Sequence, residues 1–149
     1  MQEQIFTIQD TKKWLNRGYK LRDTIRSLEV AQMRAYDIVT GTTMTLSERV
    51  QESHGNGNES KLITYADYCR EIDKHKAELF IILQQITSAI MKVDNNIYKN
   101  ILISRYLNFE TWETIAVNMN YSYMHICRLH EKALEKIKDV IECYSRPVI

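Results

Sequence analysis

An apolar repeat between Leu62 and Val93 is the feature that most restricts how this chain can fold. Its members recur at alternating intervals of three and four residues, and Lys76 is the one polar member. Such a spacing places the side chains along one face of an α-helix. We therefore predict a long helix that starts near Ser60 or Thr64 and ends near Val93. The apolar members are Leu62, Tyr65, Cys69, Ile72, Leu79, Leu83, Ile86, Ile90 and Val93.

A second long helix is predicted from Thr7 to Val39. Its apolar stripe has the same alternating spacing but is weaker, because a glycine and a glutamine occupy two of its positions. Thr7 or Asp10 could cap its start, and Gly41 is suited to end it. The whole chain has only four glycines and one proline, so few residues interrupt helices. Composition and periodicity together predict an all-α fold.

Residues 40–61 separate the two predicted helices. They are polar, aperiodic and rich in Gly, Ser, Thr and Asn, which predicts a long loop that is partly disordered at "HGNGNES". Across this loop, the repeat could pack antiparallel on Thr7–Val39 in a coiled-coil-like pair. It could also pair with a second copy of the chain through Leu62–Val93. Both arrangements are compatible with an apolar face that further residues broaden, namely Phe80, Ile82 and Ala89.

The repeat is interrupted at "VDNN", residues 93–96, where Asp94 could cap the following helix. Three shorter helices are predicted beyond it, at about Asn96–Leu107, Trp112–Met119 and Tyr123–Cys143. We therefore predict two domains. Residues 1–93 form the region of long helices, and residues 94–149 form a second, C-terminal domain.

The stretch after Thr111 has the pattern of a helix-turn-helix. Thr111 and Ser122 are good N-caps for two helices, and Asn120 in the turn between them tolerates positive φ. Ala116 is small enough for the helices to cross closely. Apolar residues are available to close a small core, at Ile115, Met119, Tyr121, Ile126 and Leu129. An ordinary helical hairpin is the alternative interpretation.

The C-terminal third of the chain, "YKNILISRYLNFETWETIAVNMNYSYMHICRLHEKALEKI", resembles region 4 of bacterial sigma factors. The resemblance rests on Arg105–Tyr106, Ile115–Ala116, the cap Ser122 and Ala133–Leu134. The sequence departs from the sigma pattern at "NFET", where sigma factors often have glycine. It also departs at Tyr123–Met124, where they often have arginine and glutamate, so a typical −35 element is not the expected target.

The layout of nearly the whole chain is similar to small phage and prophage transcription regulators of Gram-positive bacteria, of the ArpU/RinA late-transcription type. "MNYS" and "RLHEKAL" carry the strongest part of this similarity. The resemblance implies a sequence-specific DNA-binding regulator, sigma region-4-like, that controls phage genes with the host RNA polymerase. It implies double-stranded DNA as a partner. The expected location is the cytoplasm of a bacterial cell, since neither a signal peptide nor a membrane span is apparent.

If the second helix of the motif enters a major groove, its first residues point at base edges. With Ile126 facing inward, the exposed set is Tyr123, Met124, His125, Cys127 and Arg128. Arg128 is the best candidate for base readout, because arginine can pair bidentately with guanine. The competing interpretation is a surface salt bridge with Glu131 or Glu135. Met124 could contact a thymine methyl group, and Tyr123 could contact a base or a phosphate.

Other residues of the motif suit the DNA backbone. Ser122, His125 and Lys132 are predicted to contact phosphates, together with the amides at the helix start. Thr111 and Trp112 could reach a phosphate from the preceding helix start. For Trp112, packing in the small core is the stronger alternative.

Net charge limits how DNA could be bound. The formal charge is +1, and residues 122–138 hold four Lys or Arg against two Glu. Attraction must come from this modest patch, so we predict weak, salt-sensitive binding that dimerisation or RNA polymerase reinforces. The three cysteines form no disulfide framework, and neither a signal peptide nor a membrane span is apparent.

Enzymatic and metal-dependent functions are not predicted. His125, Cys127 and His130 spread around a helix axis without a fourth ligand, so no zinc or other cofactor is expected. No catalytic constellation is present either. Two other functions remain open. The chain could be a phage small terminase-like packaging protein, whose long helices build a ring, or a module that binds polymerase without binding DNA.

Overall fold

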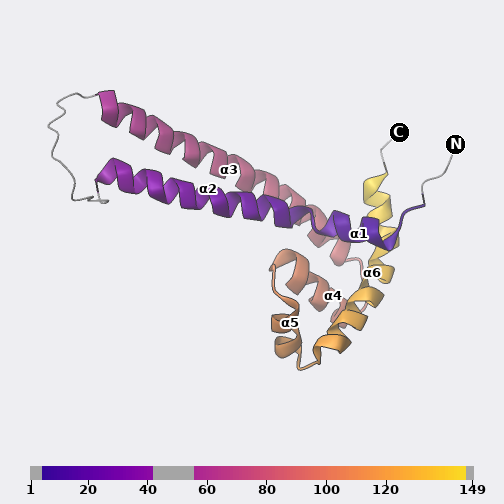
Figure 1. Ribbon diagram of the computed structural model, residues 1–149. Coiled ribbons are helices and arrows are strands. Elements are labelled where there is room, and N and C mark those ends of the chain that lie inside the picture. Colours follow the sequence, from indigo (N-terminus) through magenta and orange to yellow (C-terminus); the bar gives the residue numbers. More distant parts are fainter. Residues whose placement is uncertain (1–4, 42–55, 147–149) are drawn as a thin grey trace. The chain divides into compact units, whose positions relative to one another are not determined.

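The computed structural model describes residues 5–41 and 56–146, which contain helices and no strand (Figure 1). The all-α prediction is therefore confirmed. The helices are α1 (Ile8–Leu15), α2 (Arg17–Thr40), α3 (Asn56–Ile90), α4 (Asn96–Leu102), the π-helical turn η1 (Ile103–Leu107), α5 (Trp112–Met119) and α6 (Tyr123–Ser145). None of them is long and apolar enough to cross a membrane.

The single N-terminal helix predicted from Thr7 to Val39 is wrong, because the helix is divided at Asn16 into α1 and α2. Thr7 caps α1 in a capping box, in which Asp10 N donates to Thr7 Oγ1 at 3.2 Å and Thr7 N donates to Asp10 Oδ2 at 2.9 Å. At the break, the Arg17 side chain hydrogen-bonds a backbone carbonyl, because its Nε donates to Trp14 O at 3.0 Å. Gly41, with φ of +67°, follows α2 as predicted.

The predicted loop is also shorter than expected. Thr40 belongs to α2 and α3 already begins at Asn56, ahead of the predicted start at Ser60 or Thr64. In a helix that is already nucleated, the polar residues at 56–61 cost only a few tenths of a kcal/mol each and Gly57 about 1 kcal/mol, so α3 can extend through them. Residues 42–55, which include the first two residues of "HGNGNES", lie outside the described residues.

Asn95, and not Asp94, caps the first of the C-terminal helices. Its Oδ1 accepts from Ile97 N at 2.9 Å and from Tyr98 N at 3.3 Å. Either side chain is a competent cap. The structure favours Asn95 because α3 ends at Ile90 and the next helix starts at Asn96. The predicted helix from Asn96 to Leu107 is present as α4 followed by η1.

Contacts divide the chain into two units, residues 1–20 with 80–149 and residues 21–79. We call them the compact unit and the hairpin unit. The sequence places a boundary between residues 93 and 94, whereas these contacts place α1 and the end of α3 with the C-terminal helices. The reason is that both segments contribute side chains to one apolar core around α6.

The core of the compact unit is built on one face of α6. Helix α6 packs against α1, α4 and α5. Its buried stripe includes Ala133, Leu134, Ile137 and Ile141, at the intervals of three and four residues that a helix face requires. Residues from other segments complete this core, namely Leu15, Ile86, Ala89, Ile90, Val93, Leu102 and Tyr106.

The hairpin unit consists of parts of α2 and α3 whose contacts run in antiparallel order (Figure 1). Three contacts define the order. Glu29 Oε1 lies 3.2 Å from Lys76 Nζ. Gln32 Nε2 donates to Cys69 Sγ at 3.1 Å. The rings of Tyr36 and Tyr65 are 5.9 Å apart between centroids.

Candidate nucleic-acid interface

The segment from Thr111 to α6 has the local geometry that its sequence predicts. Thr111 Oγ1 accepts from Thr114 N at 3.2 Å, which caps α5. Ser122 Oγ accepts from His125 N at 3.2 Å, which caps α6. Between the helices, Asn120 adopts φ of 57° and ψ of 38° in the left-handed region. Both predicted caps and the predicted role of Asn120 are confirmed.

A small second core holds α5 against α6. Ile115, Ala116 and Ile126 are buried there beside Ile101 from α4. The partly buried Met119 and Leu129 pack around them, as expected.

The prediction that Tyr121 closes this core is wrong. Its side chain is 36% exposed, and its ring lies edge-on to the His125 ring at 4.9 Å between centroids. The backbone explains this orientation. Tyr121 N donates to Ala116 O at 3.0 Å directly after the left-handed Asn120, so the chain has already turned away from the core. Tyr121 therefore adds to the exposed face of the motif.

The other face of α6 is open to solvent at its N-terminal end. Met124 is 60% exposed and Arg128 is also exposed. Because they are four residues apart, they share one face of the helix. Within the described residues no carboxylate lies within ion-pair distance of Arg128, so the salt bridge to Glu131 or Glu135 is not formed.

The remaining predicted contact residues of α6 lie around this face. His125 and Lys132 are exposed, and so is the cap Ser122. Tyr123 is exposed but interacts with Cys127, one turn later on α6, and the charge of Cys127 raises the pKa of the Tyr123 hydroxyl. That hydroxyl therefore stays protonated at neutral pH and can donate a hydrogen bond.

Trp112 takes part in packing, in line with the alternative interpretation of this residue. Its ring lies 4.4 Å from the His130 ring between centroids. The same Trp112 ring also contacts Arg105, whose guanidinium carbon lies 4.5 Å from the ring centroid. Thr111, by contrast, is exposed. The structure thus brings Thr111 and the α6 residues to the surface, while Trp112 is partly covered.

Sequence reasoning missed a buried polar pair behind α6. Tyr106 Oη and His130 Nε2 are 2.7 Å apart, and both side chains are buried. Burial raises the pKa of Tyr106 and lowers the pKa of His130 to about 4, with further lowering by the charges of Lys12 and Arg105. The imidazole is therefore neutral at pH 7.

A sequence signal for His130 existed. Residues 126, 130 and 134 form one helical stripe, and its first and last members are the buried Ile126 and Leu134. This spacing places His130 on the buried face of α6. No group of three or more metal-ligating side chains occurs among the residues that the structure describes.

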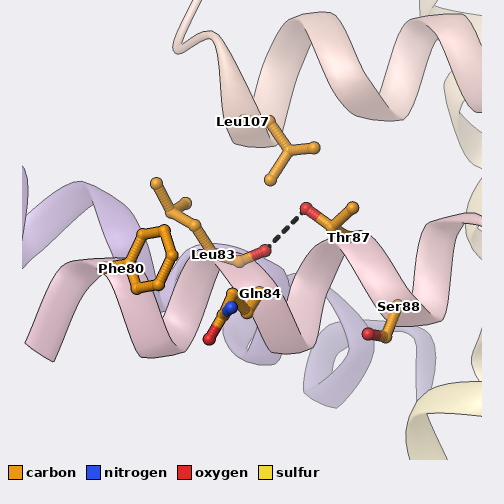
Figure 2. A pocket seen from close by; sticks show the side chains of 6 residues that line it. All are labelled: Phe80, Leu83, Gln84, Thr87, Ser88 and Leu107. Carbon is orange, nitrogen blue, oxygen red and sulfur yellow. Dashed lines mark hydrogen bonds between the residues drawn. The ribbon is translucent and has the colours of Figure 1, made fainter.

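Helix α3 and the turn η1 form a separate apolar pocket of about 450 Å³ (Figure 2). Leu83 and Leu107 face each other across it, and Phe80 stands at its edge with 63% of its surface exposed. Thr87 Oγ1 donates to Leu83 O at 2.7 Å, so its hydroxyl is satisfied within the helix. The pocket therefore offers contact area and few hydrogen bonds.

The turn "NFET" after η1 contains a second left-handed residue. Phe109 has φ of 58°, which is unusual for a bulky side chain. Its ring packs edge-on against Tyr19 at 4.9 Å between centroids. This packing offsets the strain at a position where glycine would meet no steric penalty.

Comparisons of the chain with protein families, with curated proteins and with solved structures found no match.

Proposed function

We propose that this protein is a sequence-specific DNA-binding transcription regulator in which α5 and α6 form a helix-turn-helix. One observation carries the proposal. The start of α6 is capped and its inner face is fixed in a core, while Met124 and Arg128 stand exposed on the opposite face. A reading helix needs this combination, because its side chains must reach base edges from a well-positioned backbone.

The exposed side chains suit defined parts of a DNA duplex. Arg128 has no competing ion pair in the described chain and can donate two hydrogen bonds to a guanine. Met124 can contact a thymine methyl group, and Tyr123 can donate to a base or a phosphate. His125 and Lys132 are placed to contact the DNA backbone, and the amides at the starts of α6 and α5 that do not bond their caps complete the phosphate contacts.

From the resemblance to sigma region 4 and to phage regulators, we propose that the protein regulates phage or prophage genes together with the host RNA polymerase. The left-handed Phe109 supports it, since sigma factors often have glycine in this turn. A net charge of +1 makes a single module a weak DNA binder. We therefore propose that RNA polymerase, or a second copy joined through Leu62–Val93, reinforces binding.

Selection from a duplex DNA library tests the proposal with the full chain. Wild type should enrich a common sequence, and its affinity should fall steeply between about 50 and 200 mM salt. Arg128→Ala should relax selection at one base pair, by about 1–3 kcal/mol. Arg34→Ala removes the same charge from an exposed site on α2 and serves as the matched control. If wild type shows no salt-sensitive, sequence-selective binding, the DNA proposal fails.

Two further measurements separate the alternative functions. A protein that binds polymerase but no DNA would be a polymerase-binding module. The mass in solution addresses the packaging alternative, because a ring of many subunits would favour a small terminase-like role over a monomeric or dimeric regulator.

A further inference from the structure

A polar pocket of about 310 Å³ borders α6 at Cys127, His130 and Glu131. Cys127 and Glu131 each lie three residues beyond Met124 or Arg128, so the pocket adjoins the face of α6 that carries those two side chains. Four helical segments line it. Lys12 comes from α1, Arg105 and Tyr106 from η1, Trp112 from the start of α5, and His130 with Glu131 from α6. All of these residues belong to the compact unit. The pocket is thus part of the same packed body as the proposed reading helix.

The two cations in this pocket lack a carboxylate partner. Within the described residues, neither Lys12 nor Arg105 has a carboxylate oxygen within ion-pair distance, and Glu131 at the rim pairs with neither. Both positive charges act on His130 and help to lower its pKa. The two cations outnumber the one carboxylate of the lining, that of Glu131, so the pocket keeps a net positive charge.

Arg105 is held in place before any ligand binds. One of its guanidinium nitrogens, Nη1, donates to Glu110 O at 2.9 Å. Its plane is also positioned by Trp112, whose ring centroid lies 4.5 Å from the guanidinium carbon. Little side-chain entropy is then lost when the other guanidinium nitrogens bind an anion, which favours binding.

The inner wall of the pocket is neutral. His130 is uncharged and bonded to Tyr106, so it neither repels nor neutralises the cations. Trp112 adds a flat aromatic surface. Two cations, one of them held in place, beside an aromatic wall and neutral hydrogen-bonding groups match a tetrahedral phosphate oxyanion better than a neutral ligand.

We propose that this pocket binds a phosphate group between the Lys12 ammonium and the Arg105 guanidinium. The group can belong to a free phosphorylated compound or to the backbone of DNA. A free compound would bind beside the reading helix α6, close to His130. A DNA phosphate would instead extend the footprint of α5, and this second source rests on the proposed function.

Inorganic phosphate titrated into the full chain tests the site by nuclear magnetic resonance. The chain has two tryptophans, and the indole N–H signal of Trp112 reports on the pocket while that of Trp14 is an internal reference. Phosphate should shift the Trp112 signal saturably, and chloride at equal ionic strength should not. Lys12→Gln should weaken the apparent affinity about tenfold, since one charge-assisted contact is lost. Lys13→Gln removes the same charge one residue along α1, where the side chain is exposed, and should leave the affinity unchanged.

The proposal is overturned if the Trp112 shift does not saturate or if Lys12→Gln binds phosphate as tightly as wild type. A second titration, with duplex DNA, identifies whether the phosphate group comes from DNA or from a free compound. If DNA competes with phosphate for the Trp112 shift, the ligand is the DNA backbone. If phosphate binds and DNA leaves the Trp112 signal in place, the ligand is a free phosphorylated compound. Absence of any DNA binding would refute the proposed function but not the phosphate site.

Discussion

The two units of the chain bury apolar side chains to very different extents. In the compact unit many large side chains have no exposed surface, among them Leu15, Ile86, Ile101, Leu134 and Ile137. In the hairpin unit, the described residues include only two buried apolar side chains, Ile25 and Ile72. Several others there are at least half exposed, namely Val30, Met33, Tyr36, Ile38, Leu62 and Ile63.

This difference shows what periodicity can and cannot establish. The three-four repeat runs without interruption through α3, yet Leu62 is 53% exposed and Ile86 is fully buried. Periodicity identifies the face of a helix, but burial depends on how many elements cover that face. Near its end α3 contributes to a core shared with several helices, whereas in the hairpin unit one helix covers one other.

A matched pair of leucine truncations should give the largest difference between the units. Leu134→Ala empties a fully buried site in the compact unit and should lower the free energy of unfolding by about 2–5 kcal/mol. Leu62→Ala removes a side chain that is 53% exposed and should cost less than about 1 kcal/mol. Urea unfolding followed by circular dichroism measures both. A large and concentration-dependent loss for Leu62→Ala would contradict the contrast and indicate that a second chain covers this leucine.

Acid should act on the compact unit through His130. The pKa of this imidazole is about 4 in the folded protein, below its ordinary value of about 6.5. The unfolded chain therefore takes up the proton first. The stability that the neutral imidazole contributes is present above pH 6.5 and is lost as the pH falls towards 4, by about 3 kcal/mol in total.

Urea unfolding at several pH values between 7 and 4 measures this loss. His130→Gln cannot titrate and can still hydrogen-bond Tyr106, so its stability should fall less over the same range. Carboxylates contribute their own loss near the acid end in both proteins, which makes the difference between them the informative quantity. Equal pH profiles for wild type and variant would show that His130 does not couple folding to pH.

Most helix boundaries near the candidate interface could be predicted from local sequence signals. Thr111, Ser122 and Asn120 act through hydrogen bonds or dihedral angles within a few residues, so their roles are visible without a structure. The break at Asn16 was not visible, because the residue at the break is neither glycine nor proline and the Arg17 side chain that bonds the Trp14 carbonyl there is seen only in the structure. The outward turn of Tyr121 depends on the path of the chain after Asn120. The helical stripe of residues 126, 130 and 134 indicates that His130 is buried, but no local pattern indicates its partner Tyr106, which lies 24 positions away.

Two residues in the left-handed conformation at helix ends allow a smaller test of the difference in packing between the compact unit and the hairpin unit. Asn120 ends α5 in the compact unit, and Gly41 follows α2 with φ of +67°. Replacing either with alanine should cost about 1 kcal/mol locally, because a Cβ atom disfavours this conformation. Asn120→Ala should lower the stability of the compact unit in urea unfolding, and Asn120→Gly should not. Gly41→Ala should chiefly speed amide hydrogen exchange in the last turn of α2. Global destabilisation by Gly41→Ala would mean that this helix end is packed more firmly than its exposure indicates.

The smallest expected effect concerns Lys76, the one polar member of the apolar repeat. Its Nζ lies 3.2 Å from Glu29 Oε1 on α2, and the two side chains are 54% and 44% exposed. An exposed ion pair of this kind contributes between about 0 and 1 kcal/mol, because water screens the charges and two flexible side chains must be held. A double-mutant cycle with Glu29→Gln and Lys76→Met should give a coupling in that range, and about 1 M salt should abolish it. The cycle with Lys74→Met in place of Lys76→Met should show no coupling. A coupling well above about 1 kcal/mol would mean that the pair is shielded from water. The hairpin surface would then be covered by another chain. The difference in burial between the two units would in that case exist only in the isolated chain and not in the assembly.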